Sequence, residues 1–149
     1  MRFSTSVRAH VAERRHPQGL VDTSVVIDLG RVDPASLPTA IAVSAVTLAE
    51  LAAGPHATSD PNERARRQDR LQRTETTFAS VPVDDAVARA FGRIYAAVAS
   101  GGRKARGRRA FDLLIAATAL AAELPLYTCN PSDFRELDNL LEVVPVVAR

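Results

Sequence analysis

The sequence predicts an α/β sandwich with a mostly parallel central sheet. Short apolar runs rich in Val, Ile and Leu alternate with longer segments of helical periodicity, which is the pattern of repeated strand and helix units. A second observation is that acidic residues stand where several apolar runs give way to a turn or a helix. Because ligands bind beyond the carboxyl ends of the strands in such sheets, these acids indicate a site at that edge.

Five apolar runs are expected to form the strands, and the segments between them to form helices. Gly54 and Pro55 end one predicted helix, and Asp60 followed by Pro61 begins a charged one that runs to about Phe78. The expected strands are 20–22, 41–46, 81–83, 126–128 and 141–147. The expected helices are 24–29, 47–53, 61–78, 85–100, 110–123 and a short turn at 132–137.

The helix expected after Asp84 carries an apolar stripe. Asp84 is a capping residue type, and Gly101 with Gly102 ends the segment. Apolar residues that recur at helical spacing line one face, so we expect that face to lie in the core. The stripe consists of Val87, Phe91, Ile94, Tyr95 and Val98.

Length and composition indicate one domain. The chain has 149 residues, which suit a single domain. No apolar stretch approaches the roughly 20 residues that span a bilayer, and the basic N-terminus lacks the apolar core of a signal peptide. Cys129 is the only cysteine, which fits a reducing cytoplasm.

Basic residues concentrate in two clusters although the net charge is only +2. Either cluster could hold a phosphate backbone, or could be a solvated surface in a chain that prefers arginine to lysine. The first cluster is Arg64, Arg66, Arg67, Arg70 and Arg73. The second is Arg103, Lys104, Arg106, Arg108 and Arg109, directly before the helix that carries Asp112.

Four acids are candidates for a metal site: Asp22, Glu50, Asp112 and Asp133. The first two follow predicted strands, and the other two lie near helix beginnings, so a parallel sheet could bring all four together. Crowded carboxylates repel one another unless a cation or a function sustains them. Carboxylates and water suit Mg²⁺ or Mn²⁺.

Each acid also has an ordinary structural explanation. Thr47 and Glu50 have the spacing of a capping box, and on its own this reading is favoured. Asp22 could cap the helix that follows it, and Asp112 and Asp133 could complement helix dipoles in a first turn. Only the conjunction of all four is uncommon.

Four short motifs together resemble the PIN domains of the VapC toxin type. They are Val21-Asp22-Thr23-Ser24, Thr47-Leu48-Ala49-Glu50-Leu51, Phe111-Asp112-Leu113-Leu114-Ile115-Ala116-Ala117 and Thr128-Cys129-Asn130-Pro131-Ser132-Asp133-Phe134. The resemblance implies a PIN-like α/β/α sandwich and a metal-dependent ribonuclease with Mg²⁺, or Mn²⁺ in its place. It also implies a small antitoxin partner whose C-terminal segment blocks the acidic cleft, and a homodimer. The resemblance runs over 19–149, the expected single domain, and the preceding extension, 1–18, departs from the family pattern as either a flexible tail or a misassigned start.

Site roles follow from the resemblance residue by residue. Asp22, Glu50 and Asp112 match the three central metal-site acids, and Asp133 matches the more variable fourth. Thr23, Ser24, Thr128 and Asn130 match polar positions that hydrogen-bond to metal ligands or to metal-bound water. Arg108 or Arg109 is expected to contact the RNA phosphate. Phe134, Tyr127 and Tyr95 are the large rings considered for base stacking, the last two reading more naturally as core.

Two alternatives from other functional classes stay open. A phosphoacceptor receiver domain would also place aspartates around Mg²⁺, but it needs an adjacent acidic pair after the first strand and a lysine after the last, whereas Lys104 is the only lysine. The other alternative is a catalytically weak PIN-fold binding module that acts mainly through an antitoxin. An arginine-bearing tail of such a partner could insert a guanidinium group between the carboxylates.

Overall fold

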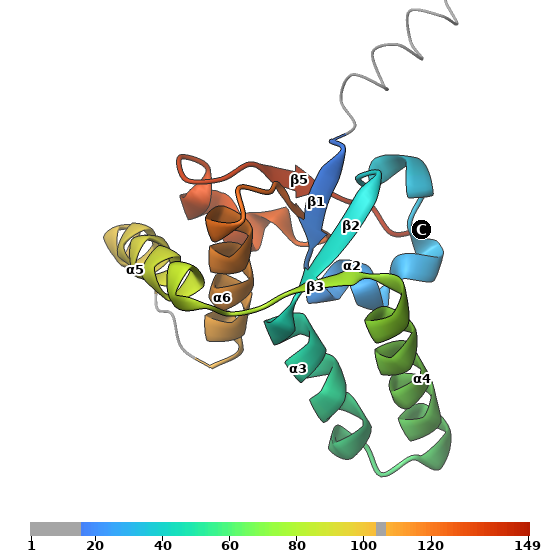
Figure 1. The fold of residues 1–149 in the computed structure, drawn as a ribbon. Helices are drawn as coiled ribbons and strands as arrows, with labels where there is room; N and C mark the ends of the chain where they lie inside the picture. Colours follow the sequence, from blue (N-terminus) through green and yellow to red (C-terminus); the bar gives the residue numbers. More distant parts are fainter. Residues whose placement is uncertain (1–15, 104–106) are drawn as a thin grey trace, which may run out of the picture.

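The computed structural model describes residues 16–103 and 107–149 (Figure 1). Most of the expected N-terminal extension, residues 1–15, lies outside the described residues. The last residues of that extension join the sheet: β1 begins at Gln18, and the carbonyl oxygens of His16 and Pro17 accept hydrogen bonds from the backbone amides of Thr39 and Ala40.

A five-stranded parallel sheet forms the centre of the domain, in the order β3-β2-β1-β4-β5. The predicted mostly parallel sheet is therefore confirmed. The strands are β1 (Gln18–Val21), β2 (Ala40–Ser44), β3 (Ala79–Val81), β4 (Leu126–Thr128) and β5 (Val143–Pro145). The α-helices are α2 (Thr23–Ile27), α3 (Ala45–Ala53), α4 (Pro61–Thr77), α5 (Asp85–Ser100) and α6 (Arg108–Ala121), and the 3-10 helices are η1 (Leu29–Arg31), η2 (Pro34–Ser36), η3 (Gly54–Ala57) and η4 (Pro131–Leu137).

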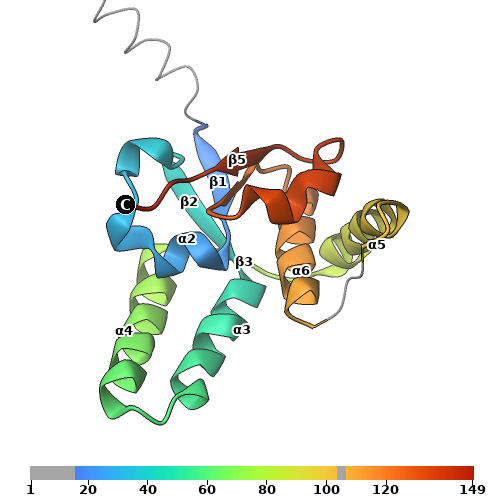
Figure 2. The same cartoon turned by 180° about the vertical axis from the view of Figure 1, so that it is seen from behind.

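Two apolar cores lie on opposite faces of the sheet, because successive strand residues point to opposite sides. Leu20 and Leu126 pack with α5 and α6 on one face, while the next residues, Val21 and Tyr127, pack with α2 and the segment after it on the other. Figures 1 and 2 show this three-layer arrangement from both sides, with α5 and α6 on one side of the sheet and α2 on the other. The sandwich predicted from the sequence is confirmed.

The strand order creates a crevice between β1 and β4. From β1 the chain builds outward to β2 and β3, then returns to add β4 and β5 on the other side of β1. At such a switch point, the connections that leave the two central strands diverge and open a crevice beyond their carboxyl ends. The segments that begin with Asp22 and with Cys129 leave β1 and β4 at this point.

Helix α3 begins earlier than the capping box predicts. Ser44 is the N-cap, and its hydroxyl accepts a hydrogen bond from the backbone amide of Val46 at 3.1 Å. The capping-box interpretation of Thr47 and Glu50 is therefore wrong, since Thr47 lies inside the helix. The physical reason is that Ser44 is also a preferred capping residue and precedes Thr47 in the chain, at the end of β2. The helix therefore begins directly after Ser44.

The apolar stripe of α5 is narrower than predicted. Val87, Ile94 and Val98 are buried, but Tyr95 is 52% exposed. With about 100° of rotation per residue, Tyr95 lies about 80° around the helix from Val87, at the margin of the buried face. The expectation that Tyr95 belongs to the core is wrong, whereas Tyr127 is buried as expected.

No helix in the described part of the chain is both long enough and apolar enough to cross a membrane.

Candidate functional site

Asp22 lies at the carboxyl end of β1, held between β4 and α2. Its backbone amide donates to the carbonyl oxygen of Tyr127 at 3.0 Å, which continues the β1–β4 pairing. Its side chain caps α2 by accepting from the amide of Val25 at 3.2 Å. The capping role considered from the sequence is thus real, and it fixes the direction of a carboxylate that is only 4% exposed.

Hydroxyl groups surround the Asp22 carboxylate. Ser24 donates to Oδ1 of Asp22 at 2.5 Å, and the Ser24 oxygen accepts from the amide of Cys129 at 3.1 Å, so this side chain joins the ends of β1 and β4. Burial raises the pKa of Asp22 above its ordinary value of 3.8, and hydrogen bonds from Ser24, Thr128 and Val25 oppose that rise. A cation beside this carboxylate would offset the desolvation cost of its charge.

Glu50 is oriented by two threonines. The hydroxyl of Thr23 donates to Oε1 of Glu50 at 2.9 Å and lies 3.0 Å from the hydroxyl of Thr47. Because Thr23 has one hydroxyl proton and gives it to Glu50, Thr47 must donate to Thr23. The result is a chain of hydrogen bonds, from Thr47 to Thr23 to Glu50, that begins at a fully buried side chain. Sequence reasoning assigned Thr23 to the site but missed Thr47.

Asp112 lies on α6 and is half-buried. The helix begins at Arg108, so Asp112 lies in the second turn and not in the first turn, as the dipole interpretation requires. Helix α6 is tied to the start of α3 by two buried hydroxyls 3.0 Å apart, those of Ser44 and Thr118. This contact fixes the helix that carries Asp112 against the helix that carries Glu50.

Asp133 lies in the first turn of η4 and is half-buried. Its backbone amide donates to the carbonyl oxygen of Asn130 at 3.1 Å, and its own carbonyl oxygen accepts from Arg109 at 3.2 Å. Asn130 occupies the N-cap position, but its side chain makes no capping bond, and its backbone amide donates to the hydroxyl of Thr128 at 3.0 Å.

All four predicted acids line one cavity of about 470 Å³. Three of the four polar candidates, Thr23, Ser24 and Asn130, line the same cavity, and Thr128 lies behind Asp22 as a hydrogen-bond donor. The remaining lining residues, which sequence reasoning did not assign to the site, are Ile27 and Asp28 of the α2 segment; Phe134 also lines it. The structure therefore gathers the predicted acids in the crevice at the switch point.

The donor set fits a hard divalent cation. Carboxylate and amide oxygens are the ligands that Mg²⁺ and Mn²⁺ prefer. Among the described residues, however, no three His, Cys, Asp or Glu side chains are arranged to hold a metal ion by themselves. Mg²⁺ usually contacts only one or two carboxylates and keeps several waters, so it does not require three protein ligands.

Arg109 of α6, which was expected to contact the RNA phosphate, is engaged by η4. Arg109 points toward η4: besides the Asp133 carbonyl, it contacts the carboxylate of Glu136 at 3.5 Å, and only 17% of its side chain is exposed. Arg109 does not line the acidic cavity, and the side chain of Arg108 lies outside the described residues, so its predicted phosphate contact stays a prediction. Of the rings considered for base stacking, Phe134 is 1% exposed, so its faces are packed in the core and are not free to stack on a base.

Comparison with protein families decides the relationship of this chain to known proteins. The model of the PIN domain matches residues 19–140. The chain belongs to the PIN domain family. This PIN domain is 38% identical to ribonuclease VapC5 of Mycobacterium tuberculosis over 128 residues, which cover 84% of this chain and 91% of that protein. It is also 38% identical to ribonuclease VapC8 of Mycobacterium tuberculosis, over 68% of this chain and 89% of that protein.

A solved structure confirms the fold of this PIN domain. The crystal structure of VapBC-5, a member of the VapBC family of toxin-antitoxin systems from Mycobacterium tuberculosis, superposes with a TM-score of 0.76 at 37% identity. The match covers 87% of this chain and 99% of the other. The VapC type inferred from the four sequence motifs is therefore confirmed.

Proposed function

We propose that this PIN domain is the ribonuclease toxin of a toxin-antitoxin pair and hydrolyses RNA phosphodiester bonds with Mg²⁺, or with Mn²⁺ in its place. One observation carries the proposal: four acids from four separate segments line one cavity at the switch point of the sheet. The names of the relatives, ribonucleases VapC5 and VapC8, support RNA as the substrate.

The acids divide into ligands and supports. Asp22, Glu50 and Asp112 would hold the principal cation directly or through water, and Asp133 would support it or a second ion. When bound, such a cation lowers the pKa of water toward neutrality and offsets charge on the phosphate. No histidine lines the cavity among the described residues, so no imidazole is available there as a general base.

The surrounding hydroxyls prepare the carboxylates for that role. Ser24 and Thr128 donate to Asp22 and favour its ionised form against the effect of burial. Thr23 holds Oε1 of Glu50, whose side chain lines the cavity. Loss of a neighbour that orients a ligating carboxylate typically costs about 10- to 100-fold in metal affinity or activity.

Cleavage of total cellular RNA by the purified protein tests the proposal. The reaction is run with Mg²⁺, with Mn²⁺ and with EDTA, and Asp22→Asn prepared identically is the control for contaminating nuclease. We expect discrete fragments that require metal and that the variant does not produce. Equal fragments from the wild type and the variant would show that this cavity is not the source of cleavage.

The partner is proposed to be a small antitoxin. VapBC-5, whose fold this chain shares at 37% identity, is a member of a family of toxin-antitoxin systems, which supports a complex of the same kind here. Pairing with an antitoxin and cleavage of cellular RNA are consistent with a protein of the cytoplasm. The homodimer implied by the resemblance stays a prediction, which the mass of the purified chain in solution tests.

In the alternative, the protein is a catalytically weak binding module that binds the same antitoxin but does not cleave RNA. This alternative predicts stable capture of a co-expressed antitoxin and no metal-dependent fragments from RNA. The acidic cavity favours the enzyme, because four carboxylates from separate segments line it, and crowded carboxylates repel one another unless a cation or a function sustains them.

A further inference from the structure

A second cavity continues from the acidic one toward helix α4. It measures about 510 Å³ and shares three lining residues with the acidic cavity: Thr23, Ile27 and Glu50. Its other wall is formed by the α3–η3 segment and by α4, where Glu63, Arg67 and Arg70 line it. Figures 1 and 2 both show α3 and α4 side by side, projecting beyond the sheet. Glu50 thus opens onto a passage whose α4 wall carries Arg70 beside the paired charges of Glu63 and Arg67.

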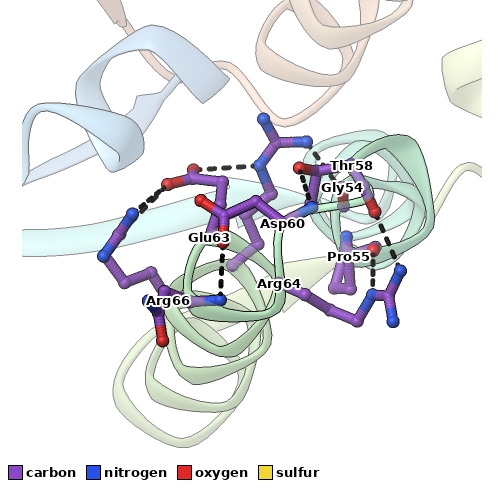
Figure 3. A network of polar contacts seen from close by, with 9 residues as sticks. Gly54, Pro55, Thr58, Asp60, Glu63, Arg64 and Arg66 are labelled. Carbon is purple, nitrogen blue, oxygen red and sulfur yellow. Dashed lines mark hydrogen bonds and ion pairs between the residues drawn. The ribbon is translucent and has the colours of Figure 1, made fainter.

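Most arginines of α4 are already neutralised or anchored. Glu63 binds Arg66 at 2.8 Å and Arg67 at 3.1 Å. Arg67 also donates to the carbonyl oxygen of Gly54 at 2.9 Å. Arg64 holds the carbonyl oxygens of Pro55 and Thr58, at 3.1 and 2.9 Å. Figure 3 shows this network, with Arg66 directed toward Glu63 and Arg64 directed toward Pro55. These contacts fasten α4 to η3.

The next two arginines along α4, Arg70 and Arg73, differ in their ion pairing. Arg73 forms an ion pair with Asp69 at 2.9 Å and is 79% exposed. Arg70 is half-buried, and its side chain has no hydrogen bond or ion pair with any residue that the structure describes. It lines the second cavity and also the neighbouring cavity between α2 and α4.

The position of Arg70 is unfavourable in the protein alone. Arg66, Arg67 and Arg73 lie three or four residues away on the same helix, where like charges repel. The carboxylates of Glu63 and Asp69 are engaged by those neighbours. A guanidinium group left without a counter-charge in a half-buried wall is available for an anion that enters the cavity, and its planar fork suits a phosphate.

We propose that Arg70 binds a backbone phosphate of the RNA strand that occupies the acidic cavity. This inference rests on the proposed function. It moves the phosphate contact from Arg108 and Arg109 of α6 to α4, on the wall that faces Glu50. RNA is favoured over an acidic segment of a protein because the cavity of Arg70 is continuous with the carboxylates, where a phosphodiester must lie to be cleaved. Arg70 would hold the strand on the side of the second cavity, next to the scissile phosphate.

Binding of RNA without cleavage tests this assignment. The parent is the full-length Asp22→Asn protein, and the probe is a fluorescently labelled single-stranded RNA of about 12 nucleotides and mixed sequence, followed by anisotropy across a salt series with Mg²⁺ present. Arg70→Gln and Arg73→Gln are added separately. Both remove one positive charge from α4, but only the first removes a group that lines the second cavity. Arg70→Lys tests whether a positive charge without the planar guanidinium group is sufficient for RNA binding.

We expect Arg70→Gln to weaken binding about 10-fold and to reduce the slope of log affinity against log salt by about 0.7, the value of one single-stranded phosphate contact. Arg73→Gln should change affinity less than about 2-fold. Arg70→Lys should retain the salt slope while recovering only part of the affinity, because an ammonium group cannot bind bidentately.

Three outcomes would overturn the inference, and they are distinguishable. Equal affinities of Arg70→Gln and Arg73→Gln would show that Arg70 contributes only general charge. If Arg70→Gln leaves the RNA affinity unchanged but weakens the capture of a co-expressed antitoxin, Arg70 belongs to a protein interface. If the parent binds no RNA and the wild type cleaves none, the proposed function fails together with this inference.

Discussion

Asp22 has an observed role as the cap of α2, which buries it at the end of β1, and a proposed role as a metal ligand, which would require it to be ionised. The two roles make opposite demands on a carboxylate. Burial raises its pKa, so the folded protein binds a proton at Asp22 more readily than the unfolded chain does. In the absence of metal, the free energy of unfolding should therefore fall as pH rises from 3.8 through the raised folded-state pKa.

The first prediction concerns Asp22→Asn. It should abolish metal-dependent RNA cleavage, with a loss of at least about 100-fold, while the free energy of unfolding in EDTA falls by no more than about 1 kcal/mol, because asparagine keeps an oxygen for the α2 cap. The measurements are RNA cleavage and urea unfolding at several pH values. The decline in stability above pH 3.8 should be smaller in the variant than in the wild type. A variant that unfolds at neutral pH would refute the dual role.

The second prediction concerns the threonine chain that orients Glu50. Thr23→Val removes the direct donor and should lower the cleavage rate about 10- to 100-fold, whereas Thr47→Val, one hydrogen bond further away, should lower it about 5-fold. Thr74→Val is the matched control, since Thr74 is also buried but donates only to the carbonyl oxygen of Arg70. Rates are compared at saturating metal. Equal cleavage rates for Thr47→Val and wild type would show that only Thr23, and not Thr47, contributes to the orientation of Glu50.

At the scale of single residues, the sequence predicts which residues line the site better than it predicts their hydrogen-bond partners. The four acids are predicted from their positions after strands and near helix starts, and they do line one cavity. The partners of Glu50 could not be predicted, because the spacing of Thr47 and Glu50 favours a capping box within one helix. The observed bond instead runs from Thr23 in another segment, and only the tertiary structure brings these two residues together.

At the scale of elements, η4 is held to α6 by a cluster of charges. Glu136 binds Arg103 at 3.0 Å and Arg109 at 3.5 Å, and only 11% of its side chain is exposed. Desolvation raises the pKa of Glu136, but a backbone hydrogen bond and the two arginines together outweigh it and hold the pKa below its ordinary value of 4.5. Because Arg109 also binds the carbonyl oxygen of Asp133, this cluster positions the fourth acid.

The third prediction follows from that cluster. A lowered pKa means that Glu136 contributes stability above pH 4.5, and that this contribution is lost as pH falls through its folded-state pKa. Glu136→Gln should therefore lower the free energy of unfolding at pH 7 by about 1 to 3 kcal/mol, and the difference from wild type should shrink as pH falls below 4.5 through the folded-state pKa. Urea unfolding across this pH range measures the difference. A constant difference at all pH values would indicate lost packing and not lost charge.

The starts of α4 and α5 are predicted correctly from the sequence. Asp60 and Asp84 cap α4 and α5 as expected, accepting from the amides of Asn62 and Val87. The start of α3 was not predictable in this way, because Ser44 and Thr47 are both good caps and the choice depends on where β2 ends. Tertiary hydrogen bonding decides it, since Ser44 also contacts Thr118 of α6.

At the scale of the whole molecule, the strand order makes the site. The sequence predicts five strands and a mostly parallel sheet, but it does not state that β1 lies between β2 and β4. That order depends on non-local pairing between strands far apart in the chain. It places the segments after β1 and β4 on either side of one crevice, which helices α3 and α6 complete with Glu50 and Asp112.

The measurement that tests the central claim most directly compares metal binding with RNA cleavage in one protein preparation. Binding of Mn²⁺ is followed by calorimetry, and the rate of cleavage is followed across the same Mn²⁺ concentrations, for wild type and for Asp112→Asn. We predict that the concentration giving half of the maximal rate coincides with the dissociation constant, and that the variant loses both binding and cleavage. Cleavage by the wild type at an unchanged rate in EDTA, or by Asp112→Asn at the wild-type rate, would contradict the account.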